Sequence, residues 1–364
     1  MHEFLLELLQ CPSCRGDLSW TIIMRDSYRI LEGLACCDSC GATYPVRDGI
    51  AVFLTPDLPR EDLWESQGSY ISRYLADHPE VEERLLDSPL ESLAPADKFF
   101  RAMILEERGK FHEAEEAYCV ADLEIYTAEY REGRELEFQF VLDRVSRLDG
   151  IILDLASGRG ALAQAMLQEL AGRDVVVTDF SPQVLRRDQR RFKWLGLDDH
   201  ANFIAFDARK MPFKGNSLPI VTTNVGLQNI RDGIAALQEL ARVISGRLMA
   251  ISLFDQEDDL ATIEFLYKNG LSDFGTRSKA LNSFKKLGWN FSVQNAIRVR
   301  ALPTPKSALI EGTGIDAIPL TETVLEWCTM VAEPAAKGQN DSGRRTVVAP
   351  PAVRQLDLKM VSGG

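Results

Sequence analysis

The most informative stretch of the sequence is Ile151-Ile-Leu-Asp154-Leu-Ala-Ser-Gly158-Arg-Gly160-Ala-Leu-Ala163. Its apolar start predicts a strand, its glycines predict a turn, and its end predicts a helix. Gly158 and Gly160 allow the backbone to approach a ligand closely, and the first turn of the following helix presents free N–H groups. A glycine turn of this kind also fits a dinucleotide site, so the stretch alone predicts a nucleotide-type ligand without identifying it.

The pattern after residue 151 alternates short β-branched runs with longer amphipathic segments, which is typical of a parallel sheet with crossover helices. The predicted strands cover residues 151–155, 175–179, 202–207, 220–224, 247–254, 291–298 and 324–332. The predicted helices lie near residues 160–171, 182–195 and 233–243. We therefore expect an α/β fold, a Rossmann-like seven-stranded sheet with helices on both faces.

Polar residues follow these predicted strands in a fixed order. Asp179 ends the second strand, where an acidic side chain can accept hydrogen bonds from both ribose hydroxyls, and Asp207-Ala208 follow the third. Asn224-Val-Gly-Leu-Gln-Asn229 follows the fourth strand, and Ala236-Leu-Gln-Glu-Leu-Ala-Arg242-Val-Ile-Ser-Gly246 leads into the fifth. Over about residues 135–300 this series resembles the class I S-adenosylmethionine-dependent methyltransferases, and within them the quinone-biosynthesis-like, methyltransferase-11 type branch.

The resemblance implies S-adenosyl-L-methionine as the cofactor. In the family pattern, the first motif surrounds the methionine moiety, and the residues that end the second strand hold the ribose and adenine. Those after the third strand contact the adenine amino group and ring, and the residue that ends the fourth lines the methionine end near the transferable methyl. The implied cofactor-binding residues are Asp154, Ala156, Gly158, Gly160, Asp179, Phe180, Asp207, Ala208 and Asn224. The family usually has glycine where this chain has Ala156.

A different reading stays open for these residues. Taken singly, Asp179 and Asp207 are also ordinary residues for turns at strand ends. A methyltransferase fold kept only as a scaffold is the alternative to a working site.

The N-terminal region predicts neither an export signal nor a membrane span. Glu3 and Glu7 interrupt its apolar run, and no stretch of the chain approaches the roughly eighteen apolar residues of a membrane-spanning helix. We expect a cytoplasmic protein, in which thiols stay reduced and cysteines are more often metal ligands than disulfides.

Two C-x-x-C pairs, Cys11-Pro-Ser-Cys14 and Cys37-Asp-Ser-Cys40, predict a metal site. Each pair forms a tight knuckle, and two knuckles supply the four thiolates that a tetrahedral zinc ion prefers. Four thiolates leave no position open for water, so this zinc ion is expected to be structural. Unligated cysteines or a redox pair are the alternatives, and Cys36 competes with Cys37 for a place in the ligand set.

The segment after the second pair runs Gly41, then Tyr44-Pro-Val-Arg-Asp-Gly-Ile50. With the cysteines, it resembles the small zinc-ribbon activator subunits that pair with methyltransferases modifying tRNA, rRNA and release factors. The resemblance covers about the first 55 residues and implies a domain that stabilises or regulates a neighbouring methyltransferase, here in the same chain.

Composition divides the chain into four expected parts. These are a β-rich zinc ribbon over residues 1–55, a helical connector or cap over 56–145, a cofactor-binding domain over 146–334 and a flexible tail over 335–364. The second half of the connector predicts one long helix from about residue 111 to 145, and the tail has a loop-like composition.

The formal charge is −13 for 364 residues, from 41 Lys and Arg against 54 Asp and Glu. A negative chain argues at first against a nucleic-acid partner. Residues 56–145 alone hold 23 acidic and 10 basic residues, so the excess acidity lies in the connector. The whole-chain charge therefore says little about what the cofactor-binding domain binds.

The residues that bind the methyl acceptor, the molecule to which the methyl group would be transferred, are harder to predict. Methyl transfer needs mainly alignment of the nucleophile with the methyl group, and none of the four histidines lies in a recognisable motif, so we assign no general base. Candidates for the lining of the acceptor pocket are Tyr126, Tyr130, Asn224, Gln228, Asn229 and Phe254. Core packing is an equal expectation for the two tyrosines.

A basic cluster at residues 186–193 contains five cations and one acid. A solvated helix face is the expected role, with an RNA or acidic partner surface as the alternative. The leading hypothesis is thus methyl transfer to a small molecule such as a secondary metabolite or quinone-like compound. An RNA or protein methyltransferase and a non-catalytic zinc-ribbon scaffold are the alternatives, and the oligomeric state is left open.

Overall fold

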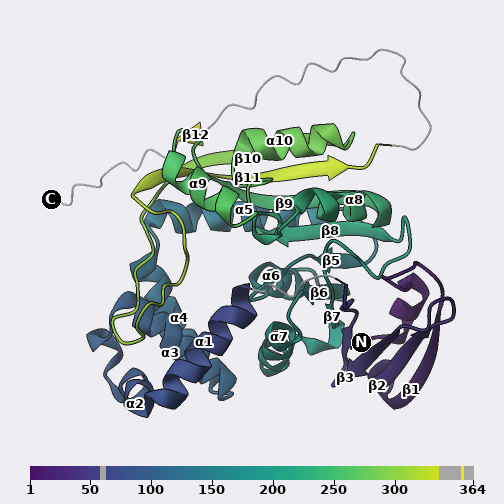
Figure 1. The fold of residues 1–364 in the computed structure, drawn as a ribbon, viewed down its shortest axis with the longest axis horizontal. Coiled ribbons are helices and arrows are strands. Elements are labelled where there is room, and N and C mark those ends of the chain that lie inside the picture. The colour runs from purple at the N-terminus through teal and green to yellow at the C-terminus, as the bar shows by residue number, and fades with distance from the viewer. Residues whose placement is uncertain (58–62, 336–353, 356–364) are drawn as a thin grey trace.

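A computed structural model describes residues 1–57, 63–335 and 354–355. Its central strands are Ile152–Asp154 (β5), Val175–Asp179 (β6), Ala201–Ala205 (β7), Leu218–Asn224 (β8), Ile244–Phe254 (β9), Asn290–Ala301 (β10) and Thr323–Glu333 (β11). They lie side by side in the order β7-β6-β5-β8-β9-β11-β10, as Figure 1 shows. The predicted seven-stranded α/β sheet is confirmed.

The direction of these strands sets the position of a ligand site. β5 to β9 pair in parallel, whereas β11 pairs antiparallel with both β9 and β10. The chain moves outward on one side from β5 to β7 and on the other from β8, so the order reverses between β5 and β8. In open α/β sheets ligands bind at the carboxyl ends of the strands at such a reversal.

The sheet continues into the N-terminal module, which we call the ribbon (residues 1–55). It begins with a 3-10 helix, Glu3–Leu8 (η1). Four strands follow: Leu18–Asp26 (β1), Arg29–Cys37 (β2), Thr43–Arg47 (β3) and Ile50–Val52 (β4). β1 to β4 pair antiparallel in sequence order, and β4 pairs in parallel with β7. The ribbon therefore covers the β7 edge of the sheet, which the sequence did not predict, and a covered edge cannot pair with another chain.

Helices cover both faces of the sheet. They are Ala128–Val145 (α5), Ala161–Glu169 (α6), Pro182–Trp194 (α7), Gly233–Val243 (α8), Leu260–Lys268 (α9) and Arg277–Lys286 (α10), with 3-10 turns Asp198–His200 (η3) and Leu227–Asn229 (η4). Apolar side chains of α5, α6 and α7 pack in one hydrophobic cluster, and those of α8 and α10 pack in another with the ribbon. The ribbon and the sheet thus share one core.

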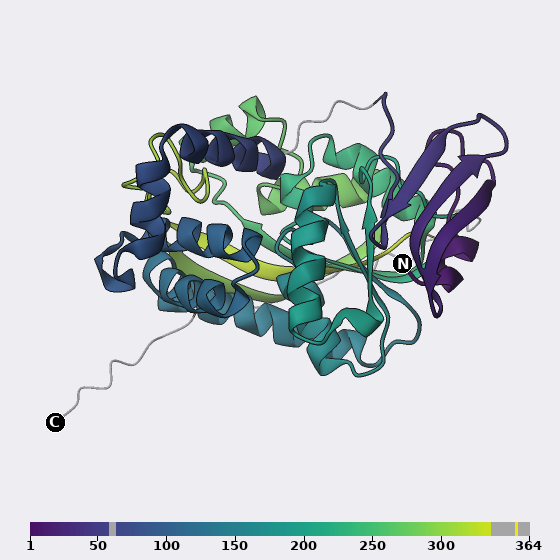
Figure 2. The same cartoon turned by 90° about the horizontal axis from the view of Figure 1, so that it is seen from below.

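A third cluster forms beside the carboxyl ends of the strands. It joins helices Leu63–Asp77 (α1), Pro79–Asp87 (α2), Pro95–Glu107 (α3) and Phe111–Ile125 (α4), with the turn Leu90–Ser92 (η2), to the loop 302–322. Asp97 is 1% exposed and accepts the backbone N–H groups of Ala308 at 3.2 Å and Leu309 at 3.3 Å. We call residues 63–125 and 302–322 the cap, and both views show them together (Figures 1 and 2).

The prediction of a single long helix over residues 111–145 is wrong, because this segment forms two helices, α4 and α5. The chain turns at Tyr126, which is extended, and Thr127 caps α5 by accepting the N–H of Tyr130 at 3.1 Å. A threonine that caps a helix offers its first turn an acceptor, which favours a new start over continuation. α4 therefore packs in the cap and α5 packs on the sheet.

No helix among the described residues is long and apolar enough to cross a membrane. A short strand, Arg354–Gln355 (β12), pairs in parallel with β10. The flexible tail expected over 335–364 otherwise falls outside the described residues, apart from Ala335.

Candidate functional site

The strand reversal is flanked by Asp154 at the end of β5 and Asn224 at the end of β8. Asp154 is 1% exposed, and its Oδ1 accepts the Thr222 hydroxyl at 2.9 Å. Burial raises the pKa of Asp154 to about 7. Its Oδ2 and the Asn224 Oδ1 are buried, and neither has a hydrogen-bond partner among the described residues. Both oxygens can therefore accept a hydrogen bond from a ligand.

The glycine turn after β5 has a left-handed backbone at three positions. The φ angles are 51° at Ala156, 56° at Gly158 and 66° at Gly160. A left-handed φ strains any residue with a Cβ, which explains why glycine is usual where this chain has Ala156. At Gly160 a Cβ would also lie 3.0 Å from the Phe192 ring, whereas at Gly158 it would meet nothing within 4 Å.

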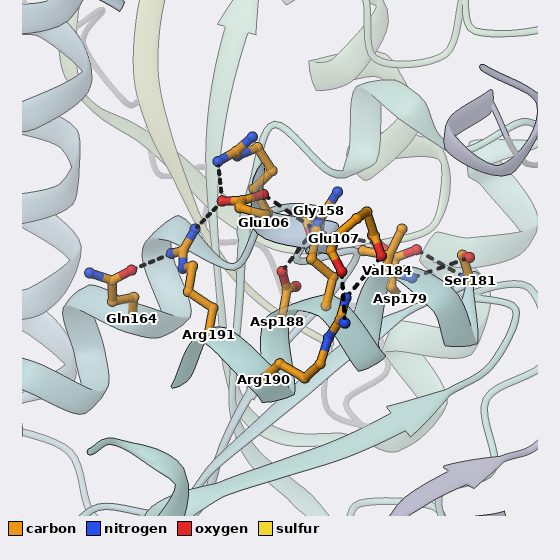
Figure 3. A network of polar contacts seen from close by, with 12 residues as sticks. Glu106, Glu107, Gly158, Gln164, Asp179, Ser181, Val184, Asp188, Arg190 and Arg191 are labelled. Atoms are coloured by element: carbon orange, nitrogen blue, oxygen red, sulfur yellow. Dashed lines mark hydrogen bonds and ion pairs between the residues drawn. The ribbon is translucent and has the colours of Figure 1, made fainter. Parts of the chain in front are cut away.

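Asp179 joins the end of β6 to this turn (Figure 3). Its Oδ2 accepts the N–H of Gly158 at 3.1 Å, and its Oδ1 accepts the N–H of Ser181 at 3.0 Å. Ser181 is the N-cap of α7, and its neighbour Phe180 is partly buried. The structure thus brings Asp154, Gly158 and Asp179 to one edge of the sheet, as the sequence predicted.

Asp207, after β7, has a partner that the sequence did not indicate. The Arg209 guanidinium donates to both carboxylate oxygens, Nε to Oδ1 at 2.9 Å and Nη2 to Oδ2 at 2.6 Å. Asp207 is 6% exposed and Ala208 is 8% exposed. A carboxylate oxygen has more than one lone pair, so this ion pair leaves acceptor capacity.

The loop after β8 is closely packed against the glycine turn. Val225 has a φ of 56°, and a Cβ at Gly226 would lie 2.9 Å from the Leu155 carbonyl oxygen. Gln228 is buried, and its two amide atoms have no hydrogen-bond partner among the described residues. Asn229 is exposed and donates to the Val225 carbonyl at 3.1 Å.

Tyr126 and Tyr130 lie where the cap meets the sheet. Their rings stack with centroids 4.8 Å apart, and the Tyr126 hydroxyl donates to Asp316 Oδ2 at 3.0 Å. Burial raises the pKa of Asp316. Both tyrosines border a cavity of about 30 Å³, which is lined by Ile125, Tyr126, Thr127, Tyr130, Leu253, Ala301, Leu302, Thr304, Asp316, Ile318, Pro319 and Leu325. Phe254 does not border it and is fully buried in the cluster on the other face of the sheet.

The basic cluster on α7 does not form the solvated face that we expected. Arg187 and Arg191 are only 7% and 9% exposed, while Arg186 and Lys193 are exposed. Arg190 Nη2 lies 2.9 Å from Glu107 Oε2 on α3 (Figure 3). The cap packs on this basic helix, and two of its carboxylates, Glu106 and Glu107, lie within ion-pair distance of Arg187, Arg190 and Arg191.

A buried carboxylate, Glu106 on α3, occupies the centre of this interface. Glu106 Oε1 accepts Arg159 Nη2 at 2.7 Å, and its Oε2 lies 3.9 Å from Arg187 Nε. The Arg159 guanidinium carbon also lies 4.3 Å from the centroid of the Tyr118 ring, also in the cap. Because Arg159 stands between Gly158 and Gly160, the cap contacts the glycine turn directly.

The four cysteines of the C-x-x-C pairs come together in the ribbon. Their Sγ atoms lie within 4.8 Å of one another, with 3.7 Å between Cys11 and Cys40 and 3.4 Å between Cys14 and Cys37. Four sulfurs bound tetrahedrally to one zinc ion are about 3.8 Å apart. Cys36 lies outside the group.

Tyr44 explains part of the second ribbon motif. Its hydroxyl lies 3.4 Å from Cys11 Sγ and 2.9 Å from Ser13 Oγ. A group that contacts a metal ligand orients it, so the motif supports the cysteine cluster from outside.

Several residues that shape the site were not predicted. Ser181 had a recognisable signal, because serine before Pro182 is a helix N-cap pattern. Glu106, Arg209 and Asp316 had none, since nothing in the sequence relates them to the residues they contact.

The switch point between β5 and β8 and the antiparallel β11 define an open, Rossmann-like α/β sheet with acidic residues at its strand ends. Two family models match the chain. A methyltransferase domain model matches residues 152–246, and a Trm112p-like protein model matches residues 2–49. Both resemblances predicted from the sequence are thereby confirmed for these segments.

Curated relatives match about a third of the chain. It is 34% identical to the ubiquinone/menaquinone biosynthesis C-methyltransferase of Coxiella burnetii, covering 32% of this chain and 47% of that protein. It is 37% identical to the demethylmenaquinone methyltransferase of Thermus thermophilus, covering 28% of this chain and 46% of that protein. The chain thus spans less than half the length of these relatives.

Among solved structures, the chain is similar to the YcgJ protein of Bacillus subtilis. The TM-score is 0.44 at 14% identity, covering 54% of this chain and 97% of that chain. A second similar structure is geranyl diphosphate C-methyltransferase from Streptomyces coelicolor, with a TM-score of 0.38 and 16% identity, covering 55% of this chain and 80% of that chain.

Proposed function

We propose that this protein is an S-adenosylmethionine-dependent methyltransferase that acts on a small molecule. The observation that carries the proposal is the meeting of Asp154, Gly158 and Asp179 at the switch point, with Asp179 Oδ2 accepting the Gly158 N–H at 3.1 Å. The match of residues 152–246 to a methyltransferase domain model supports it independently.

The residues at the switch point fit this cofactor. The buried, unpartnered Asp154 Oδ2 and Asn224 Oδ1 suit the ammonium group of its methionine moiety. The open space beside Gly158 leaves room for a ligand against the backbone. Asp179 is assigned to the ribose hydroxyls and Phe180 to the adenine, while Asp207 and the Ala208 backbone are assigned to the adenine edge. Gly160 and Ala156 shape the turn that faces the methionine moiety.

The proposed reaction depends more on the positioning of the acceptor atom than on acid–base catalysis. S-adenosylmethionine supplies an electrophilic methyl group on a sulfonium. The protein has to hold the acceptor atom in line with it, at about 3–3.5 Å, and to exclude water. We assign this role to the cap and the loop after β8, and no side chain is assigned as a general base.

The acceptor is proposed to bind between the cap and the end of β9, in an enlarged form of the cavity beside Tyr126 and Tyr130. Apolar and aromatic walls with one carboxyl, Asp316, suit a small ring compound with a polar substituent. The printed names of the curated relatives, which concern quinone biosynthesis, point to the same class. The burial of Arg187 and Arg191 removes part of the cationic surface on which an RNA acceptor would depend.

The cysteine cluster is proposed to hold one structural zinc ion through Cys11, Cys14, Cys37 and Cys40. The four sulfurs lie at separations close to those of a tetrahedral site, and thiolate ligands are consistent with a reducing, cytoplasmic setting. The ribbon would then stabilise the β7 edge of the methyltransferase sheet within the same chain.

The acceptor class can be tested with methyl-labelled S-adenosylmethionine and a fractionated cell extract. We expect enzyme-dependent label in small-molecule fractions, with the same extract lacking enzyme as the control. Label that enters only RNA or protein would contradict the proposed acceptor class.

A further inference from the structure

Arg159 is held by the cap on one side only. Its Nη2 donates to Glu106 Oε1 at 2.7 Å, and its guanidinium carbon lies 4.3 Å from the centroid of the Tyr118 ring and 5.6 Å from that of Phe99. Glu106 and Tyr118 belong to the cap, whereas Arg159 belongs to the glycine turn. The side chain therefore bridges the two parts of the molecule.

The other terminal nitrogen of Arg159, Nη1, makes no hydrogen bond within the described part of the chain. It is also buried. A buried donor without a partner destabilises the fold, and more so when the group is charged. The geometry therefore indicates an acceptor, preferably an anion, that a ligand would bring.

The proposed cofactor contains one anionic group, the α-carboxylate of its methionine moiety. The glycine turn that carries Arg159 is the part of the site assigned to that moiety. We propose that Arg159 binds this carboxylate through Nη1 while Glu106 holds the same guanidinium through Nη2. This inference rests on the proposed function and adds two residues to it: Arg159 as a cofactor-binding residue and Glu106 as a positioning residue.

The bridge has a consequence for the cap. Since one guanidinium contacts both Glu106 and the cofactor, docking of the cap preorganises the carboxylate site, and bound cofactor in turn stabilises the docked cap. Such coupling is reciprocal by thermodynamic necessity. The cap also lines the proposed acceptor cavity, so cofactor binding would order the acceptor site.

The test compares two ligands by titration calorimetry of the full chain. S-adenosylhomocysteine has the amino acid moiety with its carboxylate, and 5′-methylthioadenosine has the same nucleoside thioether without that carboxylate and its ammonium group. We expect Arg159→Gln to weaken S-adenosylhomocysteine about 10–100-fold, since charge-assisted hydrogen bonds are strong, and to change methylthioadenosine by less than about twofold. Glu106→Gln should weaken S-adenosylhomocysteine about 3–10-fold, also selectively.

Two variants serve as controls. Glu107→Gln alters the neighbouring cap carboxylate, which pairs with Arg190 at the surface, and should change neither affinity. Arg159→Lys keeps the charge but loses the fork that reaches two partners, so it should bind S-adenosylhomocysteine with intermediate affinity.

The ligand pair separates this inference from a purely structural role. The inference would be overturned if the Arg159 variants lost affinity for both ligands equally. It would also be overturned if Arg159→Gln bound S-adenosylhomocysteine as tightly as the wild type. If the wild-type protein binds neither ligand, the proposed function itself fails and takes this inference with it.

Discussion

Ile50 of the ribbon lies opposite Phe203 of β7, as neighbours in a parallel pair of strands. The pairing continues from Ala51 to Ile204 and from Val52 to Ala205, and the Phe53 N–H donates to the Ala205 carbonyl at 2.7 Å. Tyr44, Phe53 and Phe213 share one hydrophobic cluster. The ribbon and the central sheet are therefore expected to unfold together.

Loss of the metal site should destabilise the whole chain. In a Cys11→Ser, Cys14→Ser variant we expect loss of stoichiometric zinc and a fall in Tm of about 10 °C or more, because structural zinc contributes folding free energy directly. Metal analysis and thermal unfolding by circular dichroism would measure both. Cys119→Ser, at an exposed cysteine on α4, is the matched control and should change neither value.

Two results would count against this view of the ribbon. Zinc retained at one equivalent in the double variant would refute the ligand set. Zinc release well below the melting of the sheet, seen as two separate transitions in the wild-type protein, would contradict a shared core.

Glu137 on α5 gives a prediction for the pH dependence of stability. It is 0% exposed, accepts the Thr329 hydroxyl at 2.6 Å and the Asn295 amide at 2.9 Å, and burial raises its pKa to about 8. A carboxyl with a raised folded-state pKa stabilises the fold below its unfolded pKa of about 4.3, and this contribution is lost as the pH rises through 8.

Glu137→Gln should remove that dependence. The amide keeps the shape without a charge, so we expect the variant to gain about 2–6 °C in Tm over wild type at pH 8.5 and little at pH 5. Glu135→Gln, on the same helix at an exposed position, is the control. Its Tm should depend on pH in the same way as the Tm of the wild type. If the Tm of the wild type exceeds that of Glu137→Gln by more at pH 8.5 than at pH 5, the predicted direction of the pH dependence is wrong.

Gly160 gives a prediction for the shape of the glycine turn after β5. Its φ of 66° is strained for any residue with a Cβ, and that Cβ would lie 3.0 Å from the Phe192 ring. We expect Gly160→Ala to cost about 1–3 kcal/mol of stability and to weaken S-adenosylhomocysteine binding by displacing the turn. Gly172 also has a positive φ, but a Cβ there meets nothing, so Gly172→Ala should cost about 1 kcal/mol and leave binding unchanged. Equal effects of the two substitutions on binding would argue against this role for the turn.

Local patterns in the sequence were enough to predict the central sheet. Each of its seven strands came from a short β-branched run. Asp154 and Asp179 lie at strand ends and Gly158 lies in the turn after the first strand, as the pattern predicted. These features depend on neighbours in the sequence, so a single chain reveals them. The cysteine pairs are of the same kind, because their spacing alone brings two thiols to one point.

Features that depend on distant contacts were not predictable. The parallel pairing of β4 with β7 joins segments about 150 residues apart, and no local pattern indicates it. Arg187 and Arg191 looked like a solvated face because Glu106, their neighbour in space, is remote in the sequence. The break at Tyr126 depends on Thr127, whose hydroxyl also donates to the Arg300 carbonyl at 2.6 Å. Each of these errors came from tertiary structure overriding a local preference.

The central claim is that the switch point binds S-adenosylmethionine through Asp179. The most direct measurement is calorimetric titration of S-adenosylmethionine into the wild-type protein, Asp179→Asn and Asp174→Asn. Asp174 precedes the same strand at its other end, 33% exposed at its side chain, and is the matched control. We predict one site of about micromolar to millimolar affinity in the wild type and in Asp174→Asn, weakened at least tenfold in Asp179→Asn. No binding to the wild type, or equal binding to all three proteins, would contradict the account.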